Sequence, residues 1–355
     1  MCERSQSFTA WIWALAAALA VGASWGGAGA AASSCAEGDL DRSKIAEAVQ
    51  WIDENETHID SFLVQHCDVL VAEQYYNGYA ADKRHDLQSA TKTFTASLIG
   101  IALHEGVLSD IDQPLSEILP DYANLLTGEK SPITLRHLLT MTSGLKWVDF
   151  GPERSFDRVD AAPDSVAYIL SEPMVSAPGE TFFYNTGSSH LLSGVISART
   201  GMAASAYAEE KLFGPLGVSD FTWEAHTDGR SQGGWKLFVR PRDMVKFGRL
   251  YLDGGVLGDA RLMDAGFVDE ATRQQNPASE TSGYGYQMWI ESDLGIADVA
   301  AARGWGGQDI FVLDEYDMVV VFTGDIYKPG EVAAEVKYIM QTFIAPAHKN
   351  ASAAE

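Results

Sequence analysis

Ser89 and Lys92 have the residue types and the spacing for nucleophilic catalysis. The segment Ser89-Ala90-Thr91-Lys92 stands where a polar stretch leads into a long helical pattern. Residues three apart on a helix share one face, so the amine of Lys92 can reach the hydroxyl of Ser89. A lysine whose pKa is lowered by burial can take the proton of a serine, and a helix N-terminus stabilises negative charge nearby. The spacing therefore fits a serine nucleophile with a lysine base.

The same spacing occurs a second time, at Ser143 and Lys146. There Gly144 follows the serine directly, and the pattern places the pair at the end of a helix rather than at its start. Lys146 would not be held one turn above Ser143, so we favour Ser89. On spacing alone, Ser89 could still be a helix N-cap followed by a solvated lysine.

Two longer segments carry a family resemblance. Residues 86–95, which contain Ser89 and Lys92, resemble the nucleophile segment of the serine β-lactamase-related family, and residues 133–145 resemble its helix before the active-site loop. The family includes class C β-lactamases, DD-peptidases, family VIII esterases and 6-aminohexanoate-dimer hydrolases. The resemblance implies an α+β, β-lactamase/transpeptidase-like fold over residues 36–350. This fold has an antiparallel sheet flanked by helices and a mostly helical subdomain at roughly residues 105–245.

The resemblance also implies a role for Tyr184. It matches the tyrosine with which the family relays protons to and from the nucleophile, and a phenol near a lysine is a competent acid/base partner. Asn185 follows directly, whereas Thr186 holds the usual asparagine position of the family. This order resembles the 6-aminohexanoate-hydrolase branch and suggests Asn185 as a substrate-binding residue. The alternative is that Tyr184 is an aromatic residue of the hydrophobic core without a catalytic role.

The third family motif corresponds to Trp305, Gly306, Gly307 and Gln308, which we expect to begin a strand ending at residue 313 and to bind substrate. Glycines would let substrate approach the strand backbone, whose N–H near Gly307 would hold the oxyanion together with that of Ser89. Trp305 stands where the family has a cationic residue, which argues against β-lactamase activity. The neighbouring Arg303 could partly replace the missing positive charge. The alternative for Trp305 is packing at a strand edge.

Hydrophobic periodicity predicts the elements that position these residues. Strands are expected near both ends of the chain and helices in the middle, which indicates one antiparallel sheet built from N- and C-terminal pieces. The predicted strands are 61–64, 69–75, 284–290, 308–313 and 318–323, and the predicted helices are 40–55, 91–105, 134–141, 189–200, 202–213, 241–252 and 330–344.

The N-terminal segment predicts export. A charge-free, mostly apolar run over residues 9–32 ends in small residues, and Ala28-Gly29-Ala30 fits a signal-peptidase site, so residues 1–30 are expected to be a signal peptide. An uncleaved membrane anchor and lipidation at Cys35 are the alternatives. After cleavage Cys35 and Cys67 remain, either as a disulfide or as two free thiols.

The charge balance of the chain limits the kinds of partner that we expect it to bind. The chain of 355 residues has 25 Lys and Arg against 49 Asp and Glu, a net charge of −24. That balance argues against binding to nucleic acid or to an anionic membrane, since both require a positive face. No Cys-x-x-Cys or His-Glu-x-x-His motif is present, so we expect neither a metal nor an organic cofactor.

These observations predict a periplasmic or secreted serine hydrolase that cleaves a small amide or ester through an acyl-enzyme on Ser89, with Lys92 and Tyr184 moving protons. The expected type is closest to a 6-aminohexanoate-dimer hydrolase or a family VIII esterase. The alternative is a DD-peptidase, β-lactamase or penicillin-binding sensor that acts on cell-wall peptides or β-lactams. We expect a small-molecule substrate, no membrane association after cleavage, and a monomer or small homo-oligomer.

Overall fold

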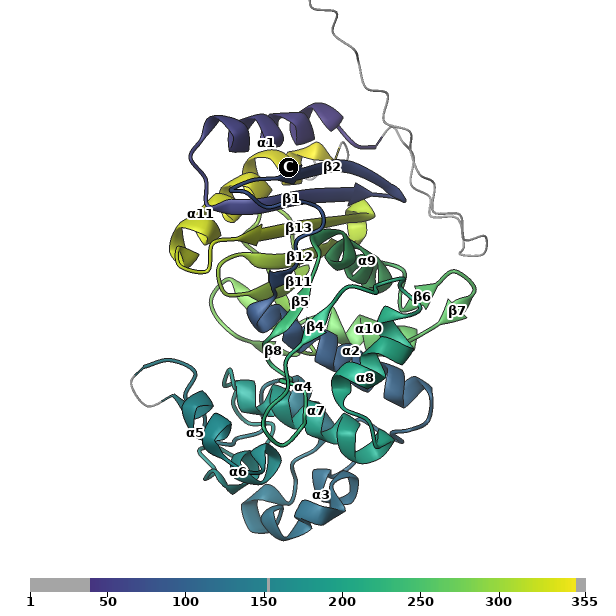
Figure 1. The fold of residues 1–355 in the computed structure, drawn as a ribbon, viewed down its shortest axis with the longest axis vertical. Helices are drawn as coiled ribbons and strands as arrows, with labels where there is room; N and C mark the ends of the chain where they lie inside the picture. The colour runs from purple at the N-terminus through teal and green to yellow at the C-terminus, as the bar shows by residue number, and fades with distance from the viewer. Residues whose placement is uncertain (1–38, 152–153, 349–355) are drawn as a thin grey trace, which may run out of the picture.

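A computed structural model describes residues 39–151 and 154–348. The predicted signal peptide, its cleavage site and Cys35 lie outside these residues. An eight-stranded antiparallel sheet forms the framework (Figure 1). Its strands, in spatial order, are β2 (Val69–Tyr75), β1 (Ile59–His66), β13 (Met318–Gly324), β12 (Gln308–Leu313), β11 (Val299–Gly304), β10 (Trp289–Glu291), β9 (Ser282–Tyr284) and β8 (Asn276–Pro277).

The centre of the sheet joins the two ends of the chain, as the sequence predicts. β1 pairs with β13 over the whole of its length, with Phe62 opposite Phe322 and Val64 opposite Val320. Every residue of β13 is buried, because hydrophobic cores cover both faces of the sheet. A strand buried on both faces reads as a continuous apolar run rather than an alternating one, which explains the uninterrupted sequence of β13.

Helices cover the sheet and fill the lower part of the molecule in Figure 1. One face packs against α1 (Arg42–Glu54) and α11 (Pro329–Ile339), and the other against α2 (Thr91–His104) and α9 (Pro241–Leu252). The remaining helices are α3 (Leu115–Ile118), α4 (Leu135–Leu139), α5 (Ser155–Ala161), α6 (Ser165–Ser171), α7 (Thr186–Thr200), α8 (Ala204–Ala208) and α10 (Ala265–Ala271). The small sheet of β3 (His85–Asp86), β5 (Leu237–Val239) and β4 (Thr222–Trp223) and the hairpin of β6 (Val256–Leu257) and β7 (Ala260–Arg261) complete the fold.

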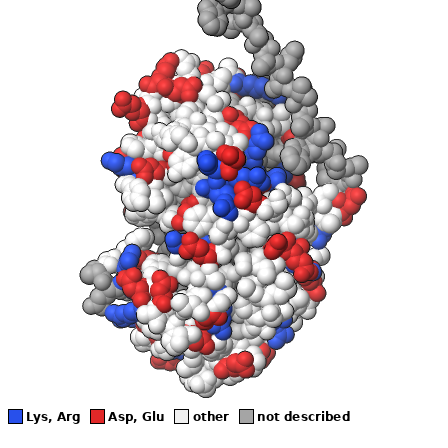
Figure 2. Space-filling model, viewed as in Figure 1, with Lys and Arg blue, Asp and Glu red and all other residues white. Residues whose placement is uncertain are grey.

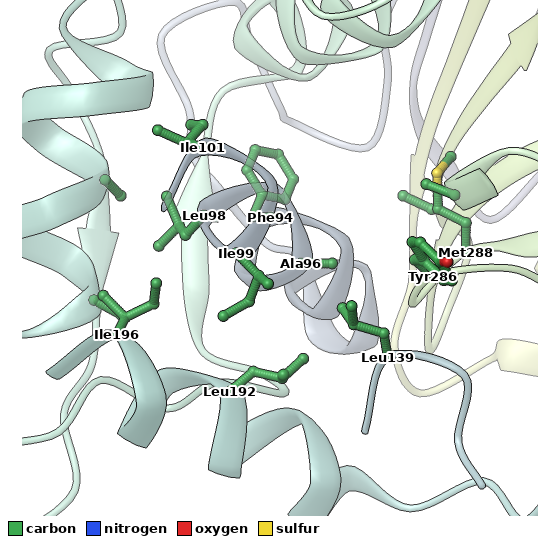
Figure 3. Packing of buried hydrophobic residues seen from close by; sticks show 14 of the residues in the cluster. Phe94, Ala96, Leu98, Ile99, Ile101, Leu139, Leu192, Ile196, Tyr286 and Met288 are labelled. Atoms are coloured by element: carbon green, nitrogen blue, oxygen red, sulfur yellow. The ribbon is translucent and has the colours of Figure 1, made fainter. Parts of the chain in front are cut away.

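α2 runs through the middle of the molecule. Its residues from Thr91 to Ala102 are all buried, and Figure 3 shows apolar side chains of α4, α7 and the segment before β10 surrounding it. Phe94 stacks on Phe247 of α9 with ring centroids 3.6 Å apart. A helix that is buried all round has its position fixed by packing on every side, so α2 can hold a reactive group at its N-terminus in a defined place.

Three expected elements differ from the structure. The single strand predicted at 284–290 is wrong: β9 and β10 form a hairpin there, and Gln287 turns between them with a φ of 55°. The expectation that Trp305 begins a strand is also wrong, because Trp305, Gly306 and Gly307 form the turn between β11 and β12. The helix predicted at 202–213 begins at Ala204 and continues beyond α8 as a π-helical turn, Glu209–Phe213.

Acidic side chains spread over the face shown in Figure 2, and basic ones gather near its middle, close to α9. The basic residues of α9 are paired: Arg242 binds Glu73, Lys246 binds Asp243, and Arg249 binds Asp253 and Asp317. Within the described residues, no helix is both long enough and apolar enough to cross a membrane.

Candidate active site

Ser89 lies on a tight turn at the start of α2. A 3₁₀ turn, Gln88–Ala90, leads directly into the helix. Asp86 holds this turn: its carboxylate accepts hydrogen bonds from the Gln88 backbone N–H at 3.0 Å and from the Gln88 side chain at 2.8 Å. Gln88 has a φ of 49°, a left-handed conformation that non-glycine residues adopt rarely and often at functional sites. The half-buried Ser89 is therefore presented by a bent backbone at a helix N-terminus.

Lys92 is in contact with Ser89. Its Nζ donates to Ser89 Oγ at 2.9 Å and to the carbonyl oxygen of Gly234 at 3.0 Å. The side chain is 1% exposed, and this burial lowers the pKa of Lys92 from 10.5 to about 7, a shift that the Asp149 carboxylate partly opposes. Burial disfavours the ammonium form, so near neutral pH a large share of Lys92 is the free amine that a general base requires.

Tyr184 lies close to the same amine. Lys92 Nζ is 5.0 Å from the centroid of the Tyr184 ring, and the Ser89 side chain is close enough to the phenol to lower its pKa, against the larger effect of burial. Burial raises the pKa of Tyr184 well above its usual value, so it stays a neutral phenol that can give and receive protons. Trp289 stacks on its ring at 5.7 Å and Tyr284 meets it edge-on at 6.2 Å. The structure thus brings the three predicted catalytic residues together.

Asn185 is placed differently from the expectation that it binds substrate. Its side chain is 1% exposed and caps α7, with Oδ1 accepting from the Ser188 N–H at 3.0 Å. Its Nδ2 donates to the Leu145 carbonyl at 2.9 Å. Both ends of the amide are engaged within the protein, so the geometry supports a capping role that fixes the backbone next to Tyr184, and we do not assign Asn185 to the substrate.

The strand beside Ser89 is β11, which the sequence did not predict as an element. β10 pairs with β11 only from Val299 to Ala301, so within the described part of the chain no strand pairs with the edge of β11 from Ala302 to Gly304 on that side. At Gly304 an added Cβ would lie 2.1 Å from the Leu87 carbonyl and 3.2 Å from the Ala90 nitrogen. Only glycine permits this approach to the nucleophile turn. The open edge therefore lies next to Ser89.

Of the remaining predicted substrate residues, only Trp305 is exposed, at 49%. Its ring contacts Phe150 with centroids 5.6 Å apart, and its Nε1 donates to the Ile326 carbonyl. Gly306 and Gly307 have φ values of 78° and 76°, as the turn requires. A Cβ on Gly307 would lie 2.2 Å from Val332 of α11, so this glycine packs against α11, away from the open edge.

The side chains of Gln308 and Arg303 are both engaged within the protein. Gln308 is 1% exposed and its amide donates to the carbonyls of Gly306 and Gly324. Arg303 pairs with Glu291 at 2.7 Å and Asp309 at 3.3 Å. Side chains alternate across a strand, so Arg303 lies on the face opposite Gly304. The idea that Arg303 replaces the missing cation beside the nucleophile is therefore wrong.

The segment around Gly234 contributes a contact that sequence reasoning missed. The Gly234 carbonyl accepts from Lys92, and a Cβ there would lie 2.4 Å from Thr186 Cγ2. The preceding Gly233 N–H donates to His190 Nδ1 at 3.3 Å, and His190 Nε2 is 2.8 Å from Ser165 Oγ. Burial lowers the pKa of His190 to about 4, so it is neutral and accepts. In the sequence, the consecutive glycines Gly233 and Gly234 could have pointed to a close approach of the backbone at this place.

The second Ser-x-x-Lys match has no such geometry. Ser143 is 2% exposed, and its Oγ is 2.9 Å from Ser188 Oγ, whereas the Lys146 side chain is exposed.

Among the described residues, no group of three or more His, Cys, Asp and Glu side chains could hold a metal ion. Cys67 is disulfide-bonded, and the expected partner, Cys35, is outside the part of the chain that the structure describes.

Known proteins share both the sequence pattern and the fold. The chain is 28% identical over 228 residues to the 6-aminohexanoate-dimer hydrolase of Paenarthrobacter ureafaciens, covering 60% of this chain and 57% of that protein. It is 28% identical over 146 residues to esterase EstB of Burkholderia gladioli, covering 38% of this chain and 37% of the esterase. The matches thus span little more than half of the first relative and about a third of the second.

Solved structures agree on the fold. EstCE1, a hydrolase with promiscuous acyltransferase activity, superposes with a TM-score of 0.71 at 14% identity, over 84% of this chain and 99% of that one. The sequence profile described as Beta-lactamase matches residues 50–341, a span that includes Ser89, Lys92, Tyr184 and the open edge of β11. The chain therefore belongs to the beta-lactamase family.

Proposed function

We propose that this protein is an exported serine hydrolase that cleaves small amides or esters through an acyl-enzyme on Ser89. The observation that carries the proposal is the 2.9 Å contact between Ser89 Oγ and Lys92 Nζ, an amine whose pKa burial lowers to about 7. A serine hydroxyl becomes a useful nucleophile only when an adjacent base takes its proton. The relatives named 6-aminohexanoate-dimer hydrolase and esterase EstB support the same chemistry.

In the first half-reaction, the neutral amine of Lys92 takes the Ser89 proton while Oγ attacks the substrate carbonyl carbon. The oxyanion forms at the start of α2, where the Ser89 N–H and the N–H groups at the open end of β11 can donate to it. Tyr184 gives its proton to the leaving amine or alcohol as the C–N or C–O bond breaks, and it recovers a proton from the Lys92 ammonium. Water then attacks the acyl-enzyme with the same groups in reverse.

The surroundings of Ser89 favour an uncharged or cationic substrate with an apolar acyl part. Tyr184, Tyr284 and Trp289 form one aromatic cluster beside the nucleophile, and Phe150 and Trp305 form a second, exposed one. Arg303 is on the opposite face of the sheet, so it offers a substrate carboxylate nothing. We propose small esters and short amides without a free carboxylate next to the scissile bond, rather than β-lactams.

Intact-mass spectrometry of the protein secreted by a host that exports it tests the proposal. After brief mixing with p-nitrophenyl butyrate, we expect an added butyryl mass that disappears as p-nitrophenol is released, and a mature N-terminus near Ala30. Ser89→Ala should lose turnover by at least about 10³-fold with unchanged circular dichroism, and Ser143→Ala serves as the matched control. Normal turnover by Ser89→Ala would refute the assignment, and a lasting penicillin adduct without turnover would favour the cell-wall alternative.

A further inference from the structure

A cavity lies next to the nucleophile turn, lined in part by His85 and Asp86, but none of Ser89, Lys92 and Tyr184 lines it. Its volume is about 630 Å³, within the range of small-molecule sites. Its walls come from the start of β1, the end of β13, the start of β12, and the short strands β3 and β5. The cavity is therefore built by elements that the rigid central sheet holds in place.

Asp60 is an uncompensated charge in this cavity. It is 5% exposed and lies at a bulge, where the pairing of β1 with β13 shifts between Ile59 and Ser61. A bulge re-aims a side chain and often marks a functional site. The carboxylate receives one long hydrogen bond, 3.3 Å from Asn77 Nδ2, and no Lys, Arg or His of the described residues forms an ion pair with it. A buried carboxylate without a cation is costly, and burial raises the pKa of Asp60 to about 6.

Gln308, which also lines the cavity, carries an unsatisfied acceptor. The carbonyls of Gly306 and Gly324 both accept from its Nε2, at 2.9 and 2.7 Å, which fixes the orientation of the amide. Its Oε1 is buried and has no hydrogen-bond partner among the described residues. Buried polar atoms are rarely left unpaired, so Oε1 indicates a missing donor. Asp86 and Asp325 also line the cavity and add negative charge to it, although their carboxylates already accept from Gln88 and from the Tyr327 N–H.

The positive groups at the cavity do not balance these acceptors. Arg84 is bound to Thr222 and Asp220, and the ring of His58 is bound to Glu335. None of these three partners lines the cavity. Burial lowers the pKa of His85 to about 4, so it is neutral at physiological pH, and Tyr79 stacks on it with centroids 4.3 Å apart. Phe238 adds a further aromatic wall. Carboxylates and aromatic faces together are the chemistry that recognises organic ammonium groups.

We propose that this cavity binds a small organic cation, a primary ammonium carried on an apolar or aromatic group. The three N–H donors of an ammonium match the Asp60 carboxylate and Gln308 Oε1, and the apolar part would lie against Tyr79 and Phe238. The site is separate from the catalytic one, so its occupancy does not depend on whether Ser89 is a nucleophile.

Isothermal titration calorimetry at pH 7.5 with three aromatic molecules of similar size but different charge tests the proposal. The molecules are benzylamine, benzyl alcohol and benzoate. Ser89→Ala is used throughout, so that turnover and the catalytic serine do not contribute. We expect benzylamine to bind at least about tenfold more tightly than the other two, as a charge-assisted hydrogen bond implies. Asp60→Asn should remove this preference, whereas Asp82→Asn, a change of the same kind at an exposed neighbouring position, should keep it.

A second variant keeps the proposal testable if the Asp60→Asn protein does not fold. If Asp60→Asn does not give the circular dichroism spectrum of the parent, Asp325→Asn takes its place, and a weakened preference for benzylamine is again expected. Equal binding of the three molecules, or an undiminished preference in a folded Asp60→Asn protein, would overturn the proposal. So would competition for benzylamine by a substrate of the parent enzyme, because the amine would then occupy the catalytic site.

Discussion

Lys92 is an amine held out of water, and no carboxylate of the described residues forms a hydrogen bond or ion pair with it. Its Nζ bonds to a hydroxyl and a carbonyl, both neutral, so burial is not compensated and the pKa falls to about 7. An ordinary lysine at pH 7 would be neutral in only about one molecule in 2,500. The environment of this one residue therefore determines how much active base is present.

This state of Lys92 predicts a pH profile. The reactive form is the neutral amine, so kcat/KM for an uncharged p-nitrophenyl ester should rise between pH 5 and 8, with a midpoint near 7, and level off above. Initial rates from pH 5 to 10 in buffers of constant ionic strength measure it. A rate that keeps rising to pH 10 would show that Lys92 retains an ordinary pKa and would count against its role as the base.

Two elements bring the backbone close to the reactive pair: β11 at Gly304 and the segment that contains Gly233 and Gly234. In both, a glycine lets one main chain approach another to within a distance that a side chain would block. The first contact places an open strand edge beside Ser89, and the second places a carbonyl on Lys92. These contacts join parts of the chain that are far apart in sequence.

Gly304→Ala tests the first contact. The new methyl group would lie 2.1 Å from the Leu87 carbonyl, so either β11 or the nucleophile turn must shift. We expect kcat/KM for a p-nitrophenyl ester to fall by about 10²-fold, since misplacement by about 1 Å has this effect. Gly330→Ala is the matched control, because a Cβ there has no neighbour within 4 Å. Equal activity of the two variants would contradict the proposed position of the strand edge.

His190→Ala tests the second contact. His190 accepts from the Gly233 N–H and positions the segment that bonds to Lys92. Its loss should admit water to Lys92, so the midpoint of the pH profile should move above 7 and kcat should fall. His190→Asn, whose oxygen can accept in place of Nδ1, should restore part of both. A lower kcat with an unmoved midpoint in both variants would indicate a merely structural role.

At the scale of the whole molecule, the catalytic arrangement carries a stability cost. Lys92 binds fewer protons in the folded state than in the unfolded state, because its folded pKa of about 7 is below the ordinary 10.5. The free energy of unfolding therefore rises with pH between these two values. The penalty is complete below pH 7 and is gone above about pH 10.5. The core around α2 must offset this penalty at neutral pH.

Lys92→Met should accordingly give an inactive but more stable protein. An apolar side chain of similar length removes the buried amine, so we expect the free energy of unfolding to increase by about 1–4 kcal/mol at pH 7. This gain should shrink as the pH is raised toward 10. Urea unfolding of both proteins at pH 7 and pH 9.5 measures the difference. A destabilised variant would show that the two hydrogen bonds of Lys92 outweigh the burial of its amine.

The sequence by itself determined the features that depend on short spacing and local pattern. These were the Ser89–Lys92 pair on one helix face, the ends of α2, the β1–β2 hairpin, the pairing of the first strands with the last ones, and the family. Each follows from periodicity, from a glycine or turn signal, or from a contiguous motif. These signals can be recognised from the sequence alone, because they do not depend on which residues are neighbours in space.

Only the tertiary structure decided what depends on contacts between distant segments. It placed Gly304 rather than Gly307 against the nucleophile turn, turned Arg303 to the other face, and used Asn185 as a helix cap. It also brought Gly234 to Lys92 and placed Asp60 and Gln308 on the walls of one cavity. The physical reason is that burial, and with it the pKa and the direction of each side chain, is set by the packing of the whole chain rather than by neighbours in sequence.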